Sequence, residues 1–353
     1  MRIQGLDFLR GVAIAGVIVR HSHLKAELPL MYKAGWAGVD LFFVLSGFLV
    51  SRLLFLEYKK QSRIAAGRFL IRRGLKIYPT FYLFLLITIP FRMWVYGEEI
   101  PTSKILHEVF FLQSYLTPVW GHTWSLAVEE HFYLALILFV WLAWRLRLLS
   151  LRWLTLAALL GIWALIFSYR FELVYAFRNY EPIIFVKSHL RMEGLIVGTV
   201  LSFVYHFFDG VAAWIRRYRR AIFVLACLLS LPPFLQEGGG YLISAYGLTL
   251  MHVGYALWVG LAASTDFFER PLKWPVIRPA YETLSFIGLH SYAIYVWHLF
   301  SRHVFDRSGL AHIPMELAYI AGSLLLGILL SIWIEQPVLR IRDRLFPRKV
   351  AII

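Results

Sequence analysis

Residues 6–24 read LDFLRGVAIAGVIVRHSHL, and this stretch decides the fold class. It is long and apolar enough to be a membrane helix, yet it carries Arg10 and His21. Because the two residues are almost a whole number of helical turns apart, they share a face, roughly 16 Å apart along the axis. An arginine in a bilayer costs several kcal/mol unless it faces protein, water or a ligand, so the pair predicts a functional site. The alternative is that Arg10 and His21 mark the two membrane surfaces.

The composition extends this pattern to the whole chain. Of 353 residues, 59% are hydrophobic and only 16% are charged, which is typical of a polytopic membrane protein. The net charge of +15 comes from short basic segments between apolar runs, so we expect contact with an anionic bilayer and no nucleic-acid partner. The single cysteine, Cys227, excludes an intramolecular disulfide. The first apolar run lacks a small-residue cleavage pattern and is interpreted as a retained helix.

The apolar runs predict an all-α bundle of about ten transmembrane helices. The expected spans are 6–24, 37–55, 77–96, 125–144, 153–170, 190–208, 221–236, 242–263, 284–301 and 315–334. A shorter apolar segment, 105–119, is expected to be re-entrant or interfacial. With these ten spans, a threading of the chain through the membrane places roughly three times as many Lys and Arg residues on one side of the membrane as on the other. This bias predicts cytoplasmic N- and C-termini. We expect one membrane domain over 1–340 and a short basic cytoplasmic tail over 341–353.

The second expected helix carries a carboxylate, Asp40, about one turn inside its extracytoplasmic end. An unpaired carboxylate there is costly, so His21 or Arg20 on the first helix is the expected partner. A capping or interfacial aspartate is the alternative. Ser46 and Gly47 in the same helix are explained by close helix packing.

A basic cluster precedes the third expected span. The segment RFLIRRGLKIYP holds Arg68, Arg72, Arg73 and Lys76 at the cytoplasmic mouth of that helix. These cations suit a phosphate-bearing cytosolic cofactor such as coenzyme A. The alternative is that they only fix the topology.

The segment HTWSLAVEEHFYL opens the fourth expected helix. Ser125, Glu129 and Tyr133 share one face at spacings of four, so this face directs a carboxylate inward. Two adjacent glutamates cannot both face the same way, and we expect Glu129 rather than Glu130 to face inward.

Two later helices also carry polar residues. Arg191 and Glu193 lie near the extracytoplasmic end of the sixth span, and Ser291, Tyr295 and His298 fall on one stripe of the ninth. His298 either lines a cavity or is a structural histidine bonded to a neighbouring helix.

Motifs for metal, serine-hydrolase and nucleotide chemistry are missing from the sequence. No HExxH or Cys/His pattern accompanies the histidines, so no metal cofactor is expected. The sequence also contains no GxSxG elbow, Walker-type loop or dinucleotide fingerprint.

Seven segments in order resemble the integral-membrane acyltransferases of acyltransferase family 3, which O-acylate carbohydrates and related acceptors. The matching segments are LDFLRG, GVDLFFVLSGFL, RRGLKIYP, TWSLAVEEHFY, RMEGLIVG, SYAIYVWH and IEQP. The chain departs from the family pattern at Lys76, where a second arginine is usual, at His131, where glutamine is common, and at Glu193, where aspartate is expected. Many members also carry a soluble esterase-like domain, which is not evident here, so any such step would need another protein.

The resemblance implies polysaccharide O-acetylation in the bacterial cell envelope, at the inner (plasma) membrane. The donor would be cytosolic acyl-CoA, acetyl-CoA in the simplest case, and the acceptor a carbohydrate or glycoconjugate. The thioester would be directed along the face that holds Arg10, and His21 would act as general base on the acceptor hydroxyl, with Asp40 or Glu129 orienting its imidazole. Donor binding would involve Arg72, Arg73, Lys76 and Tyr78, and acceptor binding would involve Trp124, Tyr133, Arg191, Glu193 and His298.

Two alternatives remain open at the level of sequence. An acyl-histidine intermediate could replace direct transfer. A secondary transporter could also use intramembrane Arg, His, Asp and Glu residues as a proton or substrate relay. Transporters of this size often show inverted repeats, and none is visible in this sequence.

Overall fold

The computed structural model describes residues 3–176, 185–236, 238, 240–268 and 275–347. These residues form helices and contain no strand. The longer helices are α1 (Gln4–Arg20), α3 (Gly38–Gln61), α4 (Ala66–Tyr96), α6 (Trp124–Arg145), α7 (Arg152–Ala176), α10 (Glu193–Phe207), α14 (Leu248–Ser264), α16 (Ser291–Phe305) and α17 (His312–Leu330). The shorter helices are α2 (Pro29–Ala34), α5 (Thr102–Val109), α9 (Ser188–Arg191), α11 (Val211–Arg217), α12 (Arg219–Leu229), α13 (Pro232–Leu235), α15 (Arg278–Leu289) and α18 (Gln336–Leu345). Two 3₁₀ turns, η1 (Gly35–Ala37) and η2 (Leu148–Ser150), and two π-helical turns, η3 (Ile243–Gly247) and η5 (Ser331–Glu335), complete the helical elements of the described residues.

The all-helical class is confirmed for the described residues, and the expected count of about ten spans is not. Within the part of the chain that the structure describes, six helical stretches could cross a membrane by length and composition. They are Pro29–Gln61, Ala66–Tyr96, Trp124–Arg145, Arg152–Ala176, Ile243–Ser264 and His312–Leu345. A seventh is possible if α10 and α11, bent by 105° to each other, count as one span.

The remaining expected spans are helical but shorter than predicted. The first ends at Arg20 after 17 residues, and the segment 221–236 is divided between α12 and α13 by Pro232 and Pro233. Proline stops a helix because it lacks the backbone N–H and clashes with the preceding turn. The segment 284–301 is divided at His290, between α15 and α16.

Helix α5 is the only regular part of the expected re-entrant segment 105–119, since residues 110–123 follow it without a further helix. The first run of apolar residues in that segment therefore forms a short helix and the rest forms a loop. This loop returns the chain to the start of α6.

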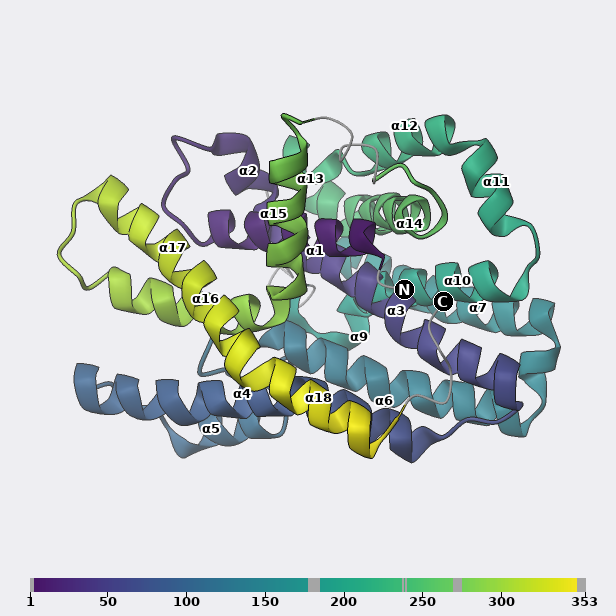
Figure 1. Cartoon of the computed structure of the whole chain (residues 1–353), viewed down its shortest axis with the longest axis horizontal. Coiled ribbons are helices and arrows are strands. Elements are labelled where there is room, and N and C mark those ends of the chain that lie inside the picture. The colour runs from purple at the N-terminus through teal and green to yellow at the C-terminus, as the bar shows by residue number, and fades with distance from the viewer. Residues whose placement is uncertain (1–2, 177–184, 237, 239, 269–274, 348–353) are drawn as a thin grey trace.

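Helices α1 and α3 lie between two groups of helices. Helices α4, α5 and α6 form one side, and α11, α12 and α14 form the other (Figure 1). Helix α3 crosses α10 so closely that a Cβ atom on Gly47 would lie 2.0 Å from the carbonyl oxygen of Leu195. Helix α1 crosses α15 in the same way, since a Cβ on Gly288 would lie 1.8 Å from the oxygen of Asp7. Small residues at such crossings let helix backbones approach each other.

Segments that the distribution of Lys and Arg assigns to the same side of the membrane are in contact with one another. On the basic side, Trp144 donates to the carbonyl oxygen of Ser62 over 2.8 Å, and Arg68 lies 3.4 Å from Glu57. At the opposite end, Arg307 lies 3.3 Å from Glu98. These contacts agree with the threading, while the cytoplasmic location of the termini stays a prediction.

The predicted boundary between residues 340 and 341 falls inside α18. Residues 1–2 of the expected domain and 348–353 of the expected tail lie outside the described residues.

Candidate active site

A cavity of about 230 Å³ lies between α1, α3, α4, α6 and α16. Its polar lining comes from a few residues on each helix: Arg10, Ser46, Arg73, Lys76, Ser125, Glu129, Ser291, Tyr292 and Tyr295. The helical periodicity that predicted an inward face on α6 and a polar stripe on α16 therefore brings both faces to the same cavity. Arg10, Arg73, Lys76 and Glu129, all predicted site residues, lie together here.

The three cations of this cavity each have a partner within the protein. Arg10 donates to Asp7 over 2.7 Å, Arg73 bonds to the hydroxyl of Tyr133, and Lys76 forms an ion pair with Glu335. Such pairing removes much of the cost of placing charge inside a membrane protein. An anionic ligand would have to compete with these partners.

Ser46 has a polar role that the sequence interpretation missed. Its hydroxyl lies 2.6 Å from the hydroxyl of Tyr133 and 3.3 Å from a carboxylate oxygen of Glu129. Its neighbour Gly47 makes the close helix contact, so only half of the predicted small-residue patch serves packing. Glu130 is outside the cavity lining, and it accepts a hydrogen bond from Tyr78 over 3.0 Å.

Three histidine rings lie edge to face beside the cavity. The centroids of His21 and His298 are 4.9 Å apart, and those of His298 and His122 are 5.0 Å apart. His21 is the first residue beyond α1, and its Nδ1 donates to the carbonyl of Val17 over 2.9 Å. Two buried ring nitrogens, His122 Nδ1 and His298 Nε2, have no hydrogen-bond partner among the described residues. Buried polar atoms without partners are rare, so this cluster is suited to a polar ligand.

Tyr295 and Ser125 connect the cavity to the histidines. The hydroxyl of Tyr295 is 2.6 Å from that of Ser125 and donates to the carbonyl of His122 over 2.9 Å. The ring centroid of Tyr295 lies 5.5 Å from that of His298. His21 itself is absent from the described cavity lining, whereas Tyr295 both lines the cavity and contacts His298, the neighbour of His21.

The loop that carries His122 is held by a buried carboxylate, Glu108. One oxygen of Glu108 accepts hydrogen bonds from the backbone of Val119 and Trp120 and from the hydroxyl of Thr123, at 2.9 to 3.0 Å. Burial raises the pKa of Glu108 to about 7 despite these bonds, because it penalises the charged form. His122 was not predicted as a site residue, although its place just before the polar face of α6 was a usable signal.

A family model described as an acyltransferase domain matches residues 3–335. The chain belongs to this acyltransferase family. The family suggested by the seven sequence motifs is thus confirmed, and its acyltransferase domain contains both the cavity and the histidine cluster.

Curated relatives of this acyltransferase domain are named as O-acetyltransferases. A peptidoglycan O-acetyltransferase of Listeria monocytogenes is 26% identical over 334 residues, covering 84% of this chain and 49% of that protein. A provisionally named O-acetyltransferase of Staphylococcus aureus is 25% identical over 330 residues, covering 84% of this chain and 50% of its own length. A provisionally named peptidoglycan O-acetyltransferase of Bacillus subtilis is 26% identical over 325 residues, which cover 84% of this chain and 48% of that protein. The chain spans about half the length of these relatives, and no solved structure matches it significantly.

In the acyltransferase domain, Asp40 pairs with neither His21 nor Arg20, although the sequence predicts one of these two residues as its partner. It lies 2.8 Å from Arg191 and 2.9 Å from His252, fully buried. The prediction failed because both partners are far away in the sequence and come from the α9 region and α14.

Arg191 and Glu193, predicted to bind acceptor, also belong to this buried network and not to the cavity lining. Glu193 lies 2.9 Å from Arg170, and none of the three side chains is more than 2% exposed. Trp124 packs on the guanidinium of Arg191, 5.4 Å from ring centroid to carbon. The geometry therefore favours a structural network around Asp40.

Arg72 and Tyr78 are separated from the cavity as well. Arg72 lies 2.6 Å from Asp343 of α18, and Tyr78 contacts Glu130. Adjacent residues on a helix point about 100° apart, so Arg72 cannot share the face of Arg73. Lys76 shares that face because it is one turn away. Among the described residues, no cluster of three or more His, Cys, Asp or Glu side chains is arranged to hold a metal ion.

Proposed function

We propose that this protein transfers an acyl group, acetyl in the simplest case, from cytosolic acyl-CoA to a hydroxyl of a carbohydrate or glycoconjugate at the membrane. The observation that carries the proposal is the cavity that combines Arg10, Arg73 and Lys76 and is lined by Tyr295, whose ring contacts two of the three clustered histidines, His122 and His298. Membership in the acyltransferase family and the names of the relatives support the same reaction class.

The donor would place its thioester end in the cavity. At about 230 Å³ the cavity suits an acyl group and the adjoining chain, and it is too small for a whole nucleotide. The phosphates would remain toward the basic mouth, where they compete with Glu335 for Lys76 and with Glu129 for Arg73.

His21 would act as general base. Its Nδ1 is bonded to Val17, so its Nε2 is the nitrogen left to take the proton of the acceptor hydroxyl. The acceptor oxygen then bonds to the thioester carbon, the carbon–sulfur bond breaks, and the CoA thiolate leaves. Arg10, which lines the cavity about three helical turns from His21, would bind the donor there and would not contact the reacting carbonyl oxygen. In the acyl-histidine variant, Nε2 attacks the thioester first.

The test is the release of CoA from acetyl-CoA by the purified protein in lipid nanodiscs, with and without carbohydrate acceptors. We expect acceptor-dependent release that His21→Ala abolishes and that His312→Ala, a change at a half-exposed histidine, leaves intact. Turnover by His21→Ala equal to wild type would exclude His21 as the base. If the protein transfers acetyl from p-nitrophenyl acetate but not from acetyl-CoA, the proposed acyltransferase activity stands and acyl-CoA is excluded as the donor.

A further inference from the structure

His21 lies at the end of its helix, where its amide and its Nδ1 still bond to carbonyl oxygens of the last turn. Helix α1 ends at Arg20, and His21 is its C-terminal cap, with φ −94° and ψ 2°. Residues beyond a helix end fray unless other groups bind the last carbonyls and the next amides. The position of the imidazole therefore depends on neighbouring elements as well as on its own bond to Val17.

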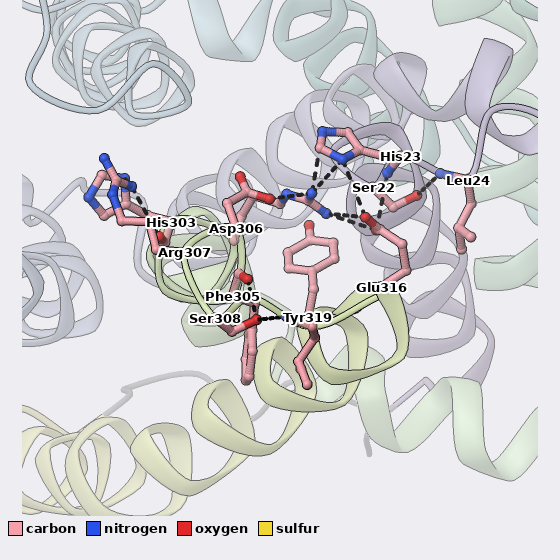
Figure 2. A network of polar contacts seen from close by, with 12 residues as sticks. Ser22, His23, Leu24, His303, Phe305, Asp306, Arg307, Ser308, Glu316 and Tyr319 are labelled. Carbon is pink, nitrogen blue, oxygen red and sulfur yellow. Dashed lines mark hydrogen bonds and ion pairs between the residues drawn. The ribbon is translucent and has the colours of Figure 1, made fainter. Parts of the chain in front are cut away.

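Two side chains of α17 bind the backbone on either side of His21. The Tyr319 hydroxyl donates over 3.2 Å to the carbonyl of Ile18, which also accepts the amide of His21. A carboxylate oxygen of Glu316 accepts the backbone N–H of His23 over 3.1 Å. Glu316 and Tyr319 are one turn apart on α17 and both are fully buried. Figure 2 shows Glu316 and His23 facing each other with Tyr319 beside them.

The same carboxylate ties α17 to the helix of the second histidine. Arg302 of α16 donates from Nη1 to both oxygens of Glu316, over 2.7 and 2.8 Å. Arg302 lies one turn after His298, and its guanidinium is 5.1 Å from the ring centroid of Tyr319. The segment after α1 and the carboxyl half of α16 are thus both fixed to one buried carboxylate.

We propose that Glu316 and Tyr319 are positioning residues that fix His21 beside His298, an inference that rests on the proposed role of His21 as base. Neither residue lines the described cavity, so neither is placed to bind donor or acceptor there. They act through the backbone at Ile18 and His23. A displacement of about 1 Å in a catalytic group can cost about 100-fold in rate, so such support has a measurable effect.

The test combines kinetics with hydrogen exchange on the full chain in nanodiscs. Tyr319→Phe removes only the hydroxyl, and Glu316→Gln removes the charge while retaining an acceptor oxygen. We expect each variant to lower kcat about three- to tenfold, as for one weakened buried hydrogen bond, with an unchanged donor KM. We also expect faster amide exchange in residues 20–24. Leu317→Ala, on the exposed face of the same helix, is the matched control and should change neither quantity.

Each outcome decides the inference. Faster exchange together with a kcat loss, restricted to the two buried positions, supports it. Unchanged exchange at 20–24, or faster exchange with full kcat, overturns it. If wild type shows no turnover with any donor, the proposed function fails, and the exchange rates of Tyr319→Phe alone decide whether α17 holds the end of α1.

Discussion

At the scale of single residues, Lys76 is the cation of the cavity whose substitution is predicted to change mainly one kinetic constant, the donor KM. It pairs with Glu335 and lies 5.5 Å from the ring centroid of Tyr292. If it also binds the donor anion, Lys76→Gln should raise the donor KM about tenfold and change kcat less than about threefold, because a charge-assisted contact is lost from the ground and transition states alike. Steady-state kinetics with varied acetyl-CoA measure this.

Arg72 provides the matched control for this prediction. It carries a similar charge nearby on α4, but it contacts Asp343 on another face. Arg72→Gln should therefore leave the donor KM unchanged. An equal rise in KM for both variants would indicate a general effect of basic charge, not a specific contact at Lys76.

Glu108 makes the stability of the loop before α6 depend on pH. Its pKa in the folded protein is about 7 because burial disfavours the carboxylate, which is above the value of about 4.5 for an exposed glutamate. Its contribution is therefore fully present below about pH 4.5 and is lost as pH rises through 7. We expect the melting temperature of wild type, relative to Glu108→Gln, to fall between pH 5 and pH 8.5.

Thermal unfolding in nanodiscs across that pH range measures this difference. Glu99→Gln, at an exposed carboxylate close to α5, is the control and should track wild type at every pH. A difference between wild type and Glu108→Gln that stays constant with pH would contradict the prediction.

At the scale of the elements, the crossing of α3 and α10 depends on the missing side chain of Gly47. A Cβ there would lie 2.0 Å from a backbone oxygen, which cannot rotate away. Gly47→Ala should therefore destabilise the protein by about 1–3 kcal/mol through overpacking. Gly161→Ala on α7 meets nothing within 4 Å and should be neutral or stabilising. Denaturation midpoints of the two variants, measured side by side, test this contrast; similar midpoints would contradict it.

Helical periodicity accounts for the part of the candidate site that could be predicted. It placed Ser125 and Glu129 on one face and Ser291 and Tyr295 on another, and both faces line the cavity. Apolar runs and charge bias likewise indicated the all-helical membrane fold. They predicted more spans than the described helices confirm; the apolar run 221–236, for example, contains prolines that divide it.

The missed parts have three causes: a contact between distant segments, a loop residue, and two neighbouring residues on different faces of one helix. The partner of Asp40 is 151 residues away, and no local pattern indicates it. His122 lies in a loop, where neither helical nor strand periodicity assigns a direction to a side chain. Arg72 was grouped with Arg73 because they are neighbours in a charge cluster, although the helix turns them apart.

At the scale of the whole molecule, the predicted orientation can be tested by labelling. The threading places residue 60, at the end of α3, in the cytoplasm and residue 308, after α16, outside. In a Cys227→Ser background, Ser308→Cys should react with an impermeant maleimide in intact cells, and Lys60→Cys should react only after lysis. Both positions are exposed, so access through the membrane decides the result. The opposite pattern would reverse the assignment of the termini.

The buried pairing of Asp40 with Arg191 has a consequence for biogenesis. The ribosome makes the carboxylate 151 residues before its guanidinium partner, so the nascent chain must keep an uncompensated anion until translation is well advanced. Release of the early helices into lipid, one at a time, would expose that anion to hydrocarbon. Retention of these helices at the insertion machinery until the second half of the polypeptide arrives, or protonation of Asp40, avoids that cost.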